Sequence, residues 1–168
     1  VQVIMTRSAK KFIGPLTLQT LSGQPVLGDS LFQSDQDPLN HLWVTQGRGE
    51  QLPADLFIIA PATANLLGKY AQGIADDFLS TALLAAPCSV LVAPAMNSSM
   101  FHSKAIQKNL KILATRGVTL IGPEIGTLAS YDEEDGPGRM TEPEEIIEVA
   151  ARLVARTDVF AKKRITIT

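Results

Sequence analysis

The sequence has 168 residues, of which 45% are hydrophobic and 19% charged, with a formal net charge of −2 at pH 7. This balance is typical of a globular domain with a sizeable core and not of a disordered chain. The small net charge and the aromatic content of 5% give no basis for binding nucleic acid or an anionic membrane. No apolar run approaches the ~20 residues that span a bilayer.

Short apolar runs alternate with helical patterns along the chain. Strands are predicted where branched apolar residues cluster, and helices where apolar residues recur every three or four positions. The predicted strands cover residues 1–6, 56–60, 90–93 and 118–121, and the predicted helices cover 15–22, 66–71, 76–86, 104–115 and 142–154. Because strands alternate with helices, we expect right-handed βαβ units. The predicted fold class is therefore α/β, a doubly wound, Rossmann-like parallel sheet.

Capping residues mark the ends of two predicted helices. Ser103 is placed to cap the helix that Gly117 closes. Thr141 and Glu144 have the spacing of a capping box, so Thr141 is the expected N-cap of the last helix. The segment 29–53 is polar and rich in turn residues, and 122–140 is predicted to be a loop.

Two of the predicted strands end in the same way. Residues 57–65 have the sequence FIIAPATAN, and residues 90–97 have the sequence VLVAPAMN. Proline lacks an N–H, so we expect it to end each strand. Ligands of open α/β sheets bind beyond the carboxyl ends of the strands. The sequence therefore predicts a binding site built from two similar loops.

These two segments resemble the first two signature motifs of the flavin-containing cysteine decarboxylases. GPGRM at 136–140 resembles the third, which lies on a flap over that family's active site. The three motifs occur in the family's order and cover most of the chain. Within the family, GPGRM and LATRG at 113–117 are most similar to the bacterial phosphopantothenoylcysteine decarboxylases, which form half of a bifunctional coenzyme A biosynthesis protein.

The resemblance implies FMN as the cofactor and no metal. By this resemblance, the residues expected to contact FMN or lie near its phosphate are Thr6, Arg7, Ser8, Thr63, Ala64, Asn65, Leu66 and Ala95. The residue pattern alone leaves alternatives open. Asn65 is equally suited to be a helix N-cap, and residues 6–8 are equally suited to form a solvated turn.

The resemblance also implies which residues meet the substrate. His41 would handle the thiol proton, Asn97 would hold the carboxylate, and Ala129 and Arg139 would belong to the segment that covers the substrate. Ser130 stands where the family carries the cysteine that donates a proton in the last step. From the pattern alone, His41 could be a surface histidine and Asn97 a turn residue.

The implied reaction is the FMN-dependent decarboxylation of phosphopantothenoylcysteine to phosphopantetheine. Two alternatives stay open. One is an FMN-binding, homo-oligomeric interaction or regulatory subunit without full turnover. The other is an oxidative decarboxylase of peptidyl cysteine, which needs no final proton and so tolerates Ser130. A serine hydroxyl is a far weaker acid than a thiol with a pKa near 8.5.

The resemblance further implies the domain organisation and the partners. Residues 1–157 are expected to be an FMN-binding decarboxylase domain whose first strand and helix precede this sequence, and 158–168 a linker and the first strand of a synthetase domain. A homotrimer or larger homo-oligomer is expected. The single cysteine, Cys88, cannot form an internal disulfide, which favours the cytoplasm.

Overall fold

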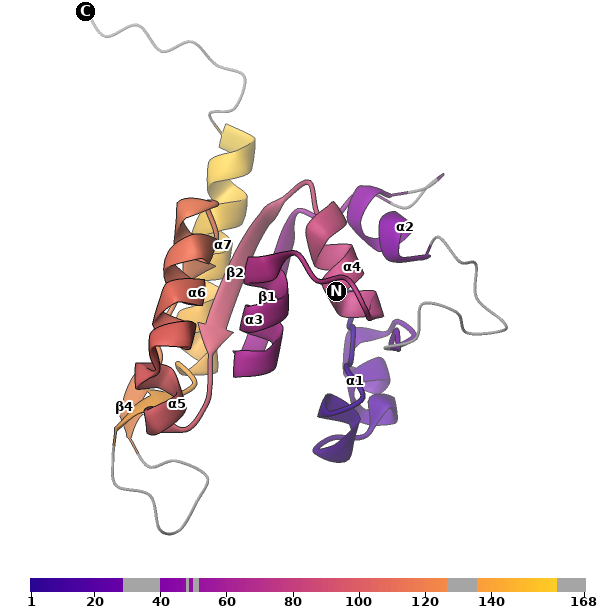
Figure 1. Cartoon of the computed structure of the whole chain (residues 1–168). Helices are drawn as coiled ribbons and strands as arrows, with labels where there is room; N and C mark the ends of the chain where they lie inside the picture. The colour runs from indigo at the N-terminus through magenta and orange to yellow at the C-terminus, as the bar shows by residue number, and fades with distance from the viewer. Residues whose placement is uncertain (29–39, 48, 50–51, 127–135, 160–168) are drawn as a thin grey trace, which may run out of the picture. The chain divides into compact units, whose positions relative to one another are not determined.

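The structure is a computed structural model that describes residues 1–28, 40–47, 49, 52–126 and 136–159 (Figure 1). The described residues form two compact units. The first is drawn from Val1–Ala54 and Gly73–Pro87, and the second from Asp55–Gln72 and from Cys88 onward.

A parallel sheet organises the second unit. It consists of β1 (Leu56–Ala62), β2 (Ser89–Pro94) and β3 (Thr119–Leu120), in the order β1-β2-β3. Every residue of the central strand after Ser89 is buried, as expected for a parallel strand that is covered on both faces. The sheet and its flanking helices confirm the predicted α/β class.

Helices cover this sheet. Leu91 and Ala93 project from the same face of β2, and they pack with Ile146 and Ala150 of α7 (Pro143–Val159) in one buried cluster. The helices α3 (Ala64–Gln72) and α6 (Lys104–Thr115) pack against each other, and α6 also packs against β3. The core of this unit therefore lies on either side of β2.

The first of the two prolines does not end its strand. The parallel pairing shifts register between Ile59 and Ala62 and then resumes, with Ala62 opposite Pro94. An irregularity is needed here because Pro61 has no N–H to donate to the ladder. The prediction that β1 ends at Ala60 is therefore wrong by two residues, whereas β2 does end at Pro94.

The capping prediction is confirmed for α6 and wrong for α7. The hydroxyl of Ser103 accepts a hydrogen bond from the N–H of Ile106 at 3.3 Å. Thr141, however, is fully buried and donates its hydroxyl to Oε1 of Glu124 at 3.3 Å. The α7 helix instead begins after Glu142, whose carbonyl accepts from the N–H groups of residues 145 and 146.

The segment predicted to be a loop contains a two-stranded antiparallel ribbon. It is formed by β4 (Glu124–Gly126) and β5 (Gly136–Arg139). Glu124 lies opposite Arg139 and the next residue, Ile125, lies opposite Pro137, so Gly138 is an extra residue on β5. Gly138 therefore forms a β-bulge. A short helix that was also not predicted, α5 (Ser98–His102), follows β2.

The first unit is mainly helical. It contains the 3-10 helix η1 (Ala9–Lys11) and the helices α1 (Pro15–Ser22), α2 (Asn40–Gln46) and α4 (Phe78–Ala85). The α1 helix has the predicted bounds, with Gly23 at its end at a φ of +68°, whereas α2 lies in the segment predicted to be turn-rich. The strand predicted over 1–6 is reduced to one parallel bridge between Ile4 and Leu27. Within the described ranges, no helix has the length and apolar character needed to cross a membrane.

A substitution at Gly122 tests the close approach of Thr141 to the chain before β4. Gly122 has a φ of +72°, and an added Cβ would lie 2.2 Å from the Thr141 hydroxyl. Gly117 has a φ of +86° with no atom within 4 Å of an added Cβ, so it is the matched control. We expect Gly117→Ala to lower the free energy of unfolding by about 1–2 kcal/mol and Gly122→Ala by about 2–4 kcal/mol. Denaturant titration measures both, and equal losses would contradict the prediction.

Candidate functional site

Two backbone hydrogen bonds join the three motifs. The N–H of Ala95 donates to the carbonyl of Ala62, and the N–H of Met96 donates to the carbonyl of Gly138, both at 3.0 Å. The first bond links the last residue of β1 to the loop after β2, and the second links that loop to β5. Segments that are far apart in the sequence therefore meet beyond the carboxyl ends of two parallel strands, where α/β proteins bind ligands.

The bulge at Gly138 explains the second of these bonds. As the extra residue of β5, Gly138 has no cross-strand partner on β4, so its carbonyl is available to a third segment. Gly138 is buried, and its carbonyl accepts from Met96. The ribbon that carries the third motif is thereby attached to the second motif.

In the loop after β1, Thr63 and not Asn65 holds the capping position. The carbonyl of Thr63 accepts from the N–H of Leu67 at 3.0 Å, and its hydroxyl lies 3.5 Å from the N–H of Leu66. Asn65 lies within the first turn of α3 and is exposed, which excludes the N-cap alternative. In the described part of the chain, the backbone N–H groups of Ala64 and Asn65 have no partner, so they remain available to a ligand.

In the loop after β2, Asn97 is an N-cap that uses only one end of its amide. Oδ1 accepts from the N–H groups of Ser99 at 2.8 Å and Met100 at 3.2 Å. The amino group Nδ2 has no partner among the described residues. Asn97 therefore presents two N–H donors whose position is fixed by the cap. The neighbouring Ala95 is partly buried.

On the ribbon, Arg139 forms an ion pair with Glu142. Both side chains are nearly half exposed, at 44% and 49%. Exposed ion pairs of this kind contribute little to stability and exchange readily with other charged groups. Arg139 is thus a cation at the edge of the segment that joins the three motifs.

The remaining predicted site residues are placed separately or not at all. In the first unit, Thr6 accepts from the N–H of Ala9 at 3.1 Å, while Arg7 and Ser8 are exposed. Ser8 occupies the N-cap position of η1 without a side-chain capping bond. His41 lies on α2, but its side chain is not described, and Ala129 and Ser130 lie outside the described residues. Their roles stay predictions.

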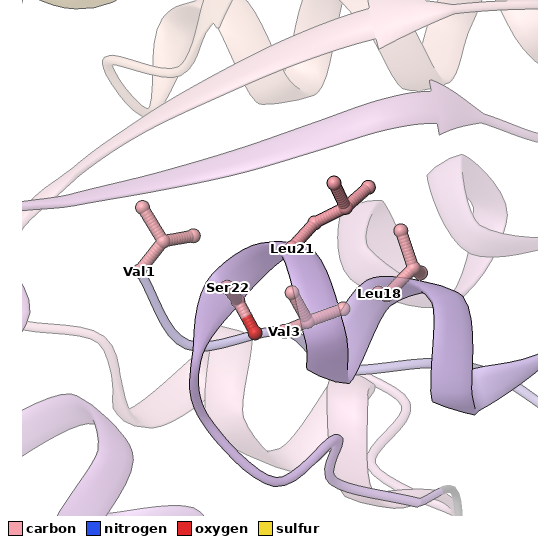
Figure 2. Close-up of a pocket in the computed structure, with 5 residues that line it drawn as sticks. All are labelled: Val1, Val3, Leu18, Leu21 and Ser22. Carbon is pink, nitrogen blue, oxygen red and sulfur yellow. The ribbon is translucent and has the colours of Figure 1, made fainter.

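The thiol of Cys88 is not suited to the proton transfer assigned to Ser130. Burial raises the pKa of the Cys88 thiol, which keeps it protonated, as expected of a small structural residue. Over the described residues there is no cluster of three or more potential metal ligands. A cavity of about 280 Å³ in the first unit is lined by Val1, Val3, Leu18, Leu21 and Ser22 (Figure 2), and it contains none of the predicted site residues.

Sequence reasoning missed the groups that shape the ribbon. It did not identify three features: the carbonyl of Gly138, the small size of Gly126 and the carboxylate of Glu142. The two glycines in GPG were a signal, because closely spaced glycines within a strand mark bulges and close approaches. Glu142 carried no local signal, since an acidic residue at the start of a helix is ordinary.

Comparisons with known proteins show which family this sequence matches. The family model "Flavoprotein" matches residues 1–155. The coenzyme A biosynthesis bifunctional protein CoaBC of Escherichia coli (strain K12) is 43% identical over 150 residues, which cover 89% of this chain and 35% of that protein. CoaBC of Bacillus subtilis (strain 168) is 43% identical over 152 residues, which cover 90% of this chain and 36% of that protein. This chain thus spans about a third of the length of these relatives.

A solved structure is similar over nearly the whole chain. A cysteine-to-serine mutant of PPC decarboxylase, complexed with pantothenoylaminoethenethiol, has a TM-score of 0.73 and 31% identity and covers 93% of this chain and 83% of that one. With the family model matched over most of the sequence and the three motifs joined in one place, this chain belongs to the flavoprotein family.

Proposed function

We propose that this chain is an FMN-dependent decarboxylase that converts phosphopantothenoylcysteine to phosphopantetheine and CO2 in coenzyme A biosynthesis. The observation that carries the proposal is the pair of backbone hydrogen bonds that joins the three motifs, from Ala95 to Ala62 and from Met96 to Gly138. The CoaBC relatives and the PPC decarboxylase structure support the same substrate.

The groups at the start of α3 fit a polar, flat cofactor. The unpartnered N–H groups of Ala64 and Asn65 and the exposed amide of Asn65 are hydrogen-bonding groups that suit the heteroatoms of FMN. The small side chains of Ala64 and Ala95 leave room for a ring to approach the backbone. When bound, FMN supplies the two-electron redox chemistry that makes the loss of CO2 possible.

The substrate would be held by groups that the fold has already oriented. The two N–H donors of Asn97 would bind the carboxylate, because the cap fixes Oδ1 and leaves Nδ2 for a ligand. An amide is neutral and so binds the carboxylate without the strong ground-state stabilisation that a cation would give. His41 would accept the thiol proton, since an imidazole titrates near neutral pH.

The identity of residue 130 favours a second candidate function. Serine replaces the cysteine of the resembling motif, and an oxidative decarboxylase of peptidyl cysteine needs no proton at that step. The solved structure of SpaF, described as an FMN-dependent cysteine decarboxylase, is 30% identical with a TM-score of 0.73 and covers 92% of this chain and 79% of that one. Release of CO2 from a peptide with a C-terminal cysteine, and not from phosphopantothenoylcysteine, would favour this candidate.

The assembly and the domain organisation are part of the same proposal. The relatives are bifunctional proteins, so we propose that residues 158–168 form a linker and the first strand of a synthetase domain. We also propose a homotrimer or larger homo-oligomer in the cytoplasm.

Asn65→Ala tests the assignment of the flavin site. Because Thr63 and not Asn65 caps α3, we expect the free energy of unfolding of the flavin-free protein to change by less than about 0.5 kcal/mol. We expect FMN to bind about tenfold more weakly, because one hydrogen bond to it is lost. Flavin fluorescence titration measures the affinity.

Ser103→Ala is the structural control for this experiment. It removes the capping side chain of α6, so it should cost about 0.5–1 kcal/mol of stability and leave the flavin affinity unchanged. A flavin affinity that Asn65→Ala leaves unchanged would refute the role of Asn65. Full-length protein that takes up no FMN would refute the proposed cofactor.

Asn97→Asp separates the cap from the substrate contact. Aspartate caps helices as well as asparagine does, so we expect the stability to be retained. The amino donors are replaced by a charged oxygen, which repels the substrate carboxylate. We therefore expect kcat/KM for CO2 release to fall about a hundredfold or more. If Asn97→Asp keeps full activity, Asn97 acts only as the cap.

Ser130→Cys tests the last proton transfer. The acidity gap between hydroxyl and thiol is several pKa units, each worth about 1.4 kcal/mol, so we expect the Ser130 protein to stall after CO2 loss. Its product should be lighter than phosphopantetheine by two hydrogen atoms, and Ser130→Cys should yield the saturated thiol. Mass spectrometry of both products decides it, and complete turnover by both proteins would contradict the stall. In support, the PPC decarboxylase that carries serine for cysteine holds pantothenoylaminoethenethiol.

A further inference from the structure

The side chain of Arg139 crosses β4 at a residue that has no side chain. A Cβ added to Gly126 would lie 3.0 Å from Nε and 3.3 Å from Cδ of Arg139. Both distances are shorter than an ordinary van der Waals contact. A methyl group at this position would therefore displace the guanidinium from its present place.

Glu142 holds the other end of the same side chain. Nη1 of Arg139, the last residue of β5, donates to Oε1 of Glu142, which lies three residues later and just before α7. Glu124, the cross-strand partner of Arg139, instead accepts the hydroxyl of the buried Thr141. Among the described residues, Glu142 is thus the carboxylate that neutralises Arg139. The pair is exposed on both sides, so another anion can take the place of Glu142.

Arg139 is also attached to the site by its neighbour. The carbonyl of Gly138 accepts from Met96, which adjoins Asn97. The guanidinium therefore extends from a strand whose backbone is fixed to the proposed substrate loop. The backbone of Arg139 is fixed, its side chain lies over Gly126, and its guanidinium is paired with Glu142. A side chain held in this way loses little conformational freedom when it binds a ligand.

We propose that Arg139 binds the phosphate group of the substrate, that Gly126 is a positioning residue whose lack of a side chain leaves room for the guanidinium, and that Glu142 competes with the phosphate for it. This inference rests on the proposed function. A guanidinium matches phosphate oxygens with parallel N–H donors. A cation paired with the substrate carboxylate would stabilise the group that must leave, so the carboxylate is better held by the neutral amide of Asn97. Phosphate binding replaces Glu142 as the partner of Arg139.

Two ligands that differ only in the phosphate test the proposal. Phosphopantetheine is the product of the proposed reaction and pantetheine is the same molecule without the phosphate, and their affinities for the full-length, flavin-loaded protein can be measured by calorimetry. The readout is the affinity ratio of the two ligands. A general loss of structure does not change this ratio, because it weakens both ligands alike. Kinetics with phosphopantothenoylcysteine then report whether KM follows the same order at constant kcat.

The two positions are expected to shift the ratio in opposite directions. Gly126→Ala should lower it about threefold and Gly126→Val about tenfold, because the bulkier side chain displaces the guanidinium further. Valine suits a strand, so β4 is retained. Glu142→Gln should raise the ratio about threefold, because it removes the competing charge. Glu148→Gln is the matched control, since Glu148 pairs with Arg152 on the exposed face of α7, and it should leave the ratio unchanged.

Each result bears on the proposal. A wild-type protein that does not prefer the phosphorylated ligand overturns it. So do variants that change both affinities equally, which would show a structural role only. If the Gly126 variants fail to fold, Glu142→Gln still decides, and an unchanged ratio in that variant overturns the proposal. A protein that binds phosphopantetheine in the expected order but releases no CO2 refutes the proposed function and leaves this inference supported.

Discussion

The arrangement of the candidate site depends on two hydrogen bonds between backbone groups, from Ala95 to Ala62 and from Met96 to Gly138. Each requires a close approach of two chain segments, and three of the four residues at the contacts, Ala62, Ala95 and Gly138, are small enough to permit it. Pro61 interrupts the regular pairing of β1 with β2, which resumes with Ala62 opposite Pro94, and the bond from Ala95 extends this pairing one residue beyond β2. The main role of the motifs is therefore to position the backbone groups that form these two bonds.

The helix caps divide the polar groups between structure and ligand. Thr63 holds the capping position of α3, so the amide of Asn65 is spared for another partner. Asn97 caps α5 with its oxygen and keeps its two N–H donors. In both loops, a group that folding requires lies beside a group that folding does not use. Such spare donors at a strand end are what a polar ligand needs.

Local patterns predicted local structure well and failed where a distant residue intervened. The bounds of α1 and the Ser103 cap depend on neighbouring residues, and both are confirmed. Thr141 has the same kind of capping signature, but its hydroxyl bonds to Glu124, 17 residues away in the sequence. A capping pattern predicts which nearby backbone groups a side chain can bond. It does not account for a competing partner from a distant part of the sequence. The β4–β5 ribbon escaped prediction because its strands are short and Gly-rich.

The same distinction separates the parts of the site that sequence could and could not supply. The motifs and their order predicted Asn65, Asn97 and Arg139 as site residues. The position of the Arg139 side chain over Gly126, however, follows only from the register of β4 and β5. Because backbone bonds hold the motifs together, a change at one side chain need not alter their placement. Ser130 stands where the resembling motif has cysteine, and its effect is expected in the last proton transfer. The chemistry of this fold therefore depends on a few side chains, while its geometry depends on the backbone that carries them.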